Sequence, residues 1–162
     1  MSERWVINAS PVILLAKAEV IHLLPKLCDE LVIPSGVVNE VAVGQRGDLG
    51  RAWLAGEGAR FIKPAMALPA ELRNADLGQG EAEVLAWALA HANFRAVLDD
   101  KRGRIWAQKL NLPLIGSLGV VVLMKQRGLI SAAAPALQKI RAAGGYVSSV
   151  SINAALEQAG EM

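Results

Sequence analysis

Short apolar runs that end abruptly in polar residues alternate along this chain with longer stretches of helical periodicity. Five runs have the length and apolar content of buried strands. They span residues 5–8, 31–33, 60–63, 96–98 and 114–115. Strands that alternate with helices predict a parallel sheet covered on both sides. We therefore expect an α/β fold, a three-layer α/β/α sandwich with a parallel central sheet.

The segments around these strands carry apolar residues at helical spacing. The predicted helices cover residues 10–24 as two short helices, then 36–43, 49–55, 80–92, 101–110, 117–127, 131–143 and 148–159, with a loop at 44–48. Ser10, Ser117 and Ser131 stand where an N-cap is usual. We expect one domain, 1–162, with a core at about 4–128 and extra C-terminal helices at about 129–162.

The bulk composition limits the location and class of the protein. At 162 residues one domain is the default. No apolar run approaches the ~20 residues of a membrane span, and the first residues show no secretory signal. The single Cys28 cannot form an internal disulfide, which fits a reducing compartment. We expect a cytoplasmic protein that does not enter a membrane.

Polar residues follow three of the predicted strands directly. Asn8 ends the first, Asp99 and Asp100 follow the fourth, and Ser117 comes just after the fifth. In an open α/β sheet, ligands bind outside the carboxyl ends of the strands. One aspartate can cap the helix that begins at Lys101, but two exceed what one cap requires. The sequence therefore predicts an acidic site at this edge.

Two helical glutamates complete the candidate set. On a helical wheel Glu81 heads a stripe with Leu85 and Ala88, whereas Glu83 points to the opposite side and is expected in solvent. The alternative for Glu81 is a place in the first turn, where the helix dipole favours an anion. Glu40 lies mid-helix and by itself is typical of a surface residue.

Basic residues gather in the second part of the chain. Residues 1–94 carry 8 Lys and Arg against 11 Asp and Glu, and residues 95–162 carry 9 against 4. Lys101, Arg102 and Arg104 directly follow the aspartate pair. Basic groups beside carboxylates suit a polyanion held by its phosphates, although a solvated helix face is the simpler interpretation.

In this order, the polar residues resemble the motifs of the PIN-domain family. The motifs are V-I-N-A-S-P at 6–11, V-V-N-E-V at 37–41, G-Q-G-E-A-E at 78–83, L-D-D-K-R-G at 98–103 and I-G-S-L-G at 115–119. The chain departs from the family at Asn8, which stands where the family has an acid.

The resemblance implies a parallel sheet between helices and a ribonuclease that depends on Mg²⁺ or Mn²⁺. It implies catalytic roles for six residues, namely Asn8, Glu40, Glu81, Asp99, Asp100 and Ser117, of which the four acids would bind the metal. It also implies RNA contacts from Ser10, Lys101, Arg102 and Arg104. Many prokaryotic members are toxins that dimerise and are silenced by a small antitoxin, so RNA, an antitoxin and a second copy are the expected partners.

Two other interpretations stay open at this point. One is a catalytically impaired module of the same fold that binds RNA or protein, because Asn8 brings no charge to the site. The other is a receiver-like or phosphatase-like α/β protein with an acidic pocket. That class needs an aspartate after the first strand to accept a phosphoryl group, and Asn8 cannot serve.

Overall fold

Five parallel strands form one sheet in the order β3-β2-β1-β4-β5. The computed structural model describes residues 3–44, 48–144 and 147–162. The strands are β1 (Arg4–Ile7), β2 (Glu30–Pro34), β3 (Ile62–Lys63), β4 (Phe94–Val97) and β5 (Leu114–Ile115). Each predicted strand is present with its ends shifted by at most two residues.

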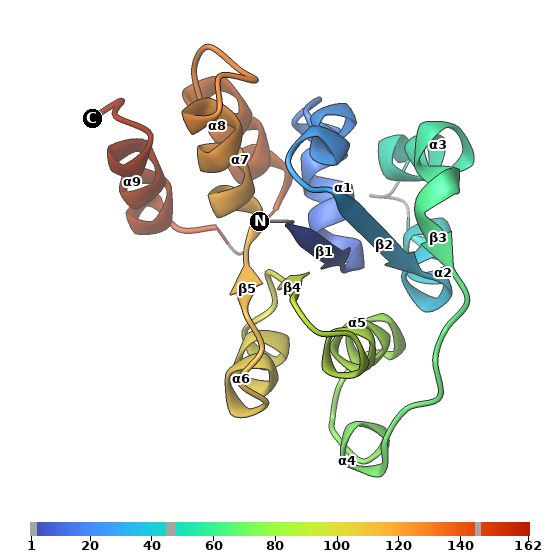
Figure 1. Cartoon of the computed structure of the whole chain (residues 1–162). Coiled ribbons are helices and arrows are strands. Elements are labelled where there is room, and N and C mark those ends of the chain that lie inside the picture. Colours follow the sequence, from blue (N-terminus) through green and yellow to red (C-terminus); the bar gives the residue numbers. More distant parts are fainter. Residues whose placement is uncertain (1–2, 45–47, 145–146) are drawn as a thin grey trace.

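Helices cover both faces of this sheet. They are α1 (Ala9–Lys17), α2 (Ser35–Val43), α3 (Asp48–Ala55), α4 (Ala70–Arg73), α5 (Gln79–Ala90), α6 (Lys101–Lys109), α7 (Ser117–Gln126), α8 (Ala134–Ala143) and α9 (Ser149–Gln158), with the 3-10 helices η1 (Ile21–Lys26) and η3 (Glu57–Phe61). In Figure 1, α5 and α6 lie on one side of the sheet, and α1, α7 and α8 lie on the other. This arrangement confirms the expected three-layer α/β/α sandwich.

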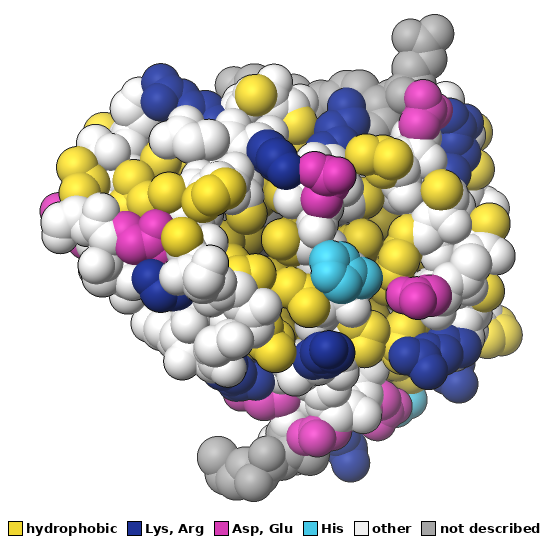
Figure 2. Space-filling view, turned by 90° about the horizontal axis from the view of Figure 1, so that it is seen from above, with side chains coloured by type: hydrophobic (Ala, Val, Ile, Leu, Met, Phe, Trp, Pro, Cys, Tyr) yellow, Lys and Arg dark blue, Asp and Glu magenta, His cyan; other side chains and the backbone are white. Residues whose placement is uncertain are grey.

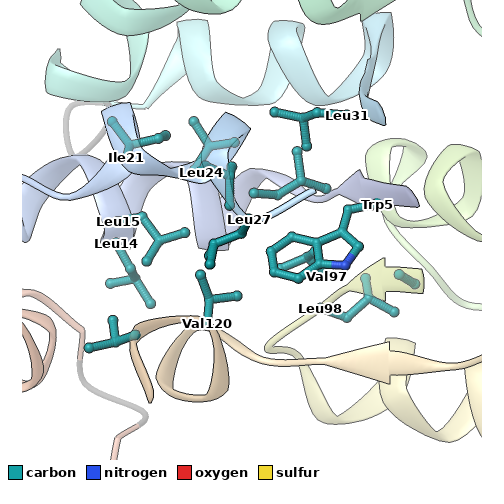
Figure 3. Close-up of a cluster of buried hydrophobic side chains, with 14 of the residues drawn as sticks. Trp5, Leu14, Leu15, Ile21, Leu24, Leu27, Leu31, Val97, Leu98 and Val120 are labelled. Atoms are coloured by element: carbon teal, nitrogen blue, oxygen red, sulfur yellow. The ribbon is translucent and has the colours of Figure 1, made fainter. Parts of the chain in front are cut away.

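The core forms around the central strand β1, whose Trp5, Val6 and Ile7 are fully buried. Figure 3 shows Trp5 beside Leu98, with Leu24 and Leu27 of the η1 segment and Val120 of α7 in the same cluster. A parallel strand that helices cover on both faces needs apolar side chains in both directions. This requirement explains the unbroken apolar runs that predicted the strands.

Strand order places the acidic residues at one edge. The chain runs from β1 outward to β2 and β3, and then returns to β4 on the other side of β1. β1 and β4 pair in parallel with Ile7 opposite Val97, and the Asn8 N–H donates to the Val97 carbonyl at 3.1 Å. A crevice opens where neighbouring connections diverge in this way. Asn8 and the aspartates after β4 therefore emerge side by side.

Two local predictions were wrong or incomplete. Helix α8 begins at Ala134, and Ser131 does not cap it. Its first N–H groups instead bond to Glu161, which accepts from Ala133 at 2.6 Å and from Ala134 at 3.0 Å. The sequence pattern predicted no helix between residues 64 and 79, where the structure has the short helix α4. Most of the predicted 44–48 loop lies outside the described residues.

No helix in the described part of the chain has the length and apolar character needed to cross a bilayer.

Candidate functional site

The carboxyl ends of the strands open into a cleft of about 1130 Å³. Its lining includes nine of the predicted site residues, namely Asn8, Ser10, Glu40, Glu81, Asp99, Asp100, Lys101, Arg104 and Ser117. Ile140 of α8 and Ala155 of α9 form part of the opposite wall. The fold thus brings together residues from seven segments of the chain, while the role of each residue stays a prediction.

The two aspartates after β4 cap two different helices. Asp100 is the N-cap of α6, and its Oδ2 accepts from the N–H groups of Arg102 at 3.1 Å and Gly103 at 3.3 Å. Asp99 turns the other way, where its Oδ1 accepts from the Ser117 N–H at 2.7 Å and its Oδ2 from the Ser117 hydroxyl at 2.6 Å. The second aspartate, which exceeded the need of one cap, therefore serves the start of α7.

Ser10 and Ser117 were predicted to cap α1 and α7, but neither is an N-cap. Helix α7 has Gly116 at its N-cap position, and Ser117 is its first residue, whose buried hydroxyl is committed to Asp99. Helix α1 has Asn8 at that position without a side-chain cap bond, so Ser10 lies one residue inside the helix. The N-caps lie one or two residues before the serines, at Asn8 and Gly116. For α1 the reason is that β1 ends at Ile7, one residue earlier than predicted.

Glu40 and Glu81 each accept a hydrogen bond from a backbone N–H with one carboxylate oxygen. Glu40 Oε1 accepts from Gly80 at 2.7 Å, and Glu81 Oε1 accepts from Gly78 at 3.3 Å. Glycines also make room for both carboxylates. A Cβ on Gly80 would lie 2.9 Å from Glu40 Oε2, and one on Gly103 would lie 2.8 Å from Glu81 Oε2. Sequence inspection missed these glycines, although G-Q-G and the glycine after D-D-K-R were visible.

Glu81 holds a proton more tightly than an ordinary glutamate. Burial is the main cause, followed by a hydrogen bond from protonated Glu81 to Asp100 and by the negative charges of Asp100 and Glu40. The N–H of Gly78 acts in the opposite direction, and together these effects raise the pKa of Glu81 to about 7. Carboxylates that crowd one another in this way favour either a shared proton or a bound cation.

The prediction that Glu83 faces solvent was wrong. Its side chain is only 4% exposed, and it accepts from the N–H of Gly36 at 2.8 Å and the amide of Gln79 at 2.7 Å. Helix α5 buries residues on nearly every side, including Ala82, Val84, Leu85, Ala86 and Ala88. A helix that is apolar all round has no solvent face for a wheel to identify.

The three basic residues after the aspartate pair do not act as one group. Arg104 lines the main cleft, Arg102 lines a second, shallower pocket on the far side of Glu81 and Asp100, and Lys101 lines both. There, Arg102 Nη1 contacts Asp76 Oδ2 at 2.7 Å and the Asp76 carbonyl at 2.9 Å. Two residues of helical rotation, at about 100° per residue, turn Arg102 away from Arg104.

A family model described as a PIN domain matches residues 4–161. The chain belongs to the PIN-domain family. The match begins with β1 and extends past the end of α9, so it includes the cleft and both of its walls. Membership indicates a nuclease-type function, and PIN domains generally depend on a divalent metal. No curated protein matches the sequence.

The oxygen atoms of this PIN domain fit such a metal in their chemistry. Mg²⁺ and Mn²⁺ prefer carboxylate, amide and water oxygens. Asn8 Oδ1 is buried and has no hydrogen-bond partner among the described residues, and the same holds for Glu81 Oε2 when Glu81 is ionised, because the Asp100 carboxylate has no proton to donate. A cation would relieve this unfavourable condition. Within the same residues, no three Asp, Glu, His or Cys side chains converge closely enough to bind a metal ion unaided. Coordination would therefore include water, as is usual for Mg²⁺.

Glu81 gives the metal-free protein a pH dependence of defined sign. Its folded-state pKa of about 7 exceeds the ordinary value of 4.5, so the folded state holds an extra proton between these values. Stability should fall as pH rises through this window. Glu81→Gln stays neutral, so thermal melts in EDTA should show a smaller fall between about pH 5 and about pH 8 than in the wild type. Parallel curves would contradict the assignment.

Proposed function

We propose that this PIN domain is a metal-dependent ribonuclease that cleaves RNA phosphodiester bonds in the acidic cleft. The observation that carries the proposal is the pair of buried, unpartnered oxygens, Asn8 Oδ1 and Glu81 Oε2, in a cleft that four carboxylates line. Buried polar atoms normally have hydrogen-bond partners, so a cation or a bound water is expected beside these oxygens. The choice of RNA and of Mg²⁺ or Mn²⁺ follows from the family resemblance.

The residues of the cleft divide the work by their contacts. Glu40, Glu81, Asp99 and Asp100 would hold the ion, directly or through water. When bound, the ion would stabilise negative charge on the phosphate and make water a better nucleophile. Ser117 fixes both oxygens of Asp99, so this carboxylate keeps one orientation. Because the pKa of Glu81 is about 7, the protein binds a cation by releasing a proton at or below neutral pH.

Asn8 supports a second candidate function. This residue is buried, and it brings a neutral amide to the position where the family has an acid. A catalytically impaired PIN domain that binds RNA or protein would need the cleft but not full metal affinity. The family match removes the receiver-like alternative. Metal titration and cleavage assays separate the two remaining functions.

Partners other than RNA are also proposals. A small antitoxin and a second copy of the chain are the partners that the toxin resemblance suggests, in the cytoplasm. Figure 2 supports a protein contact, because hydrophobic side chains fill much of the face seen there and basic residues are scattered over it. Broad apolar areas on a surface often mark interaction sites.

The first functional test is cleavage of an unstructured RNA with Mn²⁺, Mg²⁺ or EDTA. We expect cleavage only with metal, and a loss of at least about tenfold in Asp99→Asn and Glu81→Gln, because ligand geometry controls metal affinity and activity. The matched control is Glu71→Gln, an exposed acid on α4 outside the cleft. Cleavage that persists in EDTA, or an equal loss in the control, would contradict a metal-dependent enzyme.

The second test restores the missing charge. Asn8→Asp should raise Mn²⁺ affinity, because ligand charge strengthens the binding of hard cations. Without metal, the same change should lower the melting temperature, because like charges crowd the empty cleft. Calorimetric titration and melts with and without Mn²⁺ measure both effects.

The control for this test is Asn39→Asp, which adds the same charge on the exposed side of α2. If Asn8→Asp behaves like Asn39→Asp in both measurements, Asn8 does not belong to the metal site.

The third test separates the basic residues. Arg104→Ala should weaken RNA binding and reduce the salt dependence of log Kd by about one unit, as expected for one lost phosphate contact. Arg102→Ala removes the same charge from the neighbouring pocket, where Asp76 already neutralises it, and should have a smaller effect. Fluorescence anisotropy in EDTA over a range of salt concentrations measures both. Equal effects would show that RNA extends across the second pocket.

A further inference from the structure

Helices α2 and α5 hold one another by a reciprocal pair of carboxylate contacts. Glu83 of α5 accepts a hydrogen bond from Gly36 in the first turn of α2. Glu40 of α2 accepts one from Gly80 in the first turn of α5. Each glutamate thus supplies an anion to the positive end of the other helix. We call this set of four residues the α2–α5 clasp.

Glycine is required at both ends of the clasp. A Cβ on Gly36 would lie 2.3 Å from Glu83 Oε2, and a Cβ on Gly80 would lie 2.9 Å from Glu40 Oε2. Real Cβ atoms do not approach other atoms this closely, so any side chain at Gly36 would expel the carboxylate. The two glycines therefore make the close approach of the helices and carboxylates compatible.

The clasp connects directly to the acidic cleft. Glu40 belongs to both, and Glu81 lies two residues before the buried Glu83 on α5. A Cβ on Gly78 would lie 3.4 Å from Glu40 Oε1 and 3.5 Å from Glu81 Oε1, so these two carboxylates approach the same point from different helices. Their separation depends on how α2 lies against α5.

Glu83 is costly where it stands. Its carboxylate is 4% exposed, and burial of such a group needs compensating hydrogen bonds. Gly36 and Gln79 supply them. An apolar residue would fill this position in an otherwise apolar helix without that cost. The contact with Gly36, 47 positions away in the sequence, is what the carboxylate adds.

We propose that Glu83 is a positioning residue of the acidic cleft, which acts through Gly36 to set α2 against α5 and so brings Glu40 and Glu81 to the spacing that binds a divalent cation. It does not touch the ion or the substrate. The proposal rests on the function proposed above, since it assigns that cleft to metal binding.

The test compares Mn²⁺ affinity, measured by calorimetry on folded protein well below the melting temperature. Glu83→Ala should lose roughly tenfold in affinity, as is typical when a residue that orients metal ligands is removed. Glu83→Gln should recover most of this loss, because its amide oxygen can still accept from the Gly36 N–H. Val84→Ala, a fully buried neighbour on the same helix, controls for lost stability and should keep wild-type affinity.

A second pair of variants leaves Glu83 in place. Gly36→Ala should reproduce the loss in Mn²⁺ affinity by expelling the carboxylate. Gly44→Ala, at the other end of α2, is its control, because the nearest described atom to an added Cβ there is the Glu40 carbonyl oxygen at 4.0 Å. If Glu83→Ala or Gly36→Ala binds Mn²⁺ as tightly as its control, the positioning role is wrong.

Failure of the proposed function is distinguishable from failure of the clasp. If the wild type binds no Mn²⁺, the metal site is wrong, and hydrogen exchange of the Gly80 amide decides the clasp. Glu83 makes no hydrogen bond to this amide, which bonds to Glu40. Faster Gly80 exchange in Glu83→Ala than in Val84→Ala supports the mechanical coupling of the two ends. Equal exchange overturns it.

Discussion

Bonds from helix N-termini to acidic side chains organise this protein. Asp99 binds the start of α7, Asp100 the start of α6, Glu40 the start of α5 and Glu83 the start of α2. Backbone N–H groups in a first turn lack partners within their own helix, and the helix dipole favours a negative charge there. The same contacts that satisfy these groups hold the carboxylates in one place, so the stability of the fold and the geometry of the cleft depend on the same bonds.

The same hydrogen bonds affect how the cleft can bind a metal ion. Each of the acids in the cleft already accepts a hydrogen bond, and both oxygens of Asp99 do so. A carboxylate oxygen has a second lone pair, so the bonds leave room for a cation but fix its approach. Asn8 contributes an amide oxygen and no charge. The carboxylates of the site therefore have fixed orientations, but the site carries one negative charge fewer than the family pattern. How strongly it still binds a cation decides between a weak enzyme and a binding module.

The C-terminal helices complete the cleft by a long-range bond of the same type. Glu161, almost at the end of the chain, binds the first N–H groups of α8 and also pairs with Lys125 of α7 at 3.0 Å. These contacts hold the pKa of Glu161 below its ordinary value. Helices α8 and α9, which form the wall opposite the acids, are thus fixed to the sandwich by a residue that local patterns cannot associate with them.

By itself, the sequence determined the strands, their parallel arrangement and the edge where the polar residues gather, because apolar periodicity and strand-end positions are local features. It also identified nine residues that line the cleft. Only the tertiary structure decided which acid caps which helix, that Glu83 is buried, and that Arg102 pairs with Asp76 outside the main cleft. These outcomes depend on partners 18 to 47 positions away. On a helix that is buried on nearly all sides, such as α5, apolar periodicity does not show which way a given side chain faces. Only the elements that pack against the helix decide this.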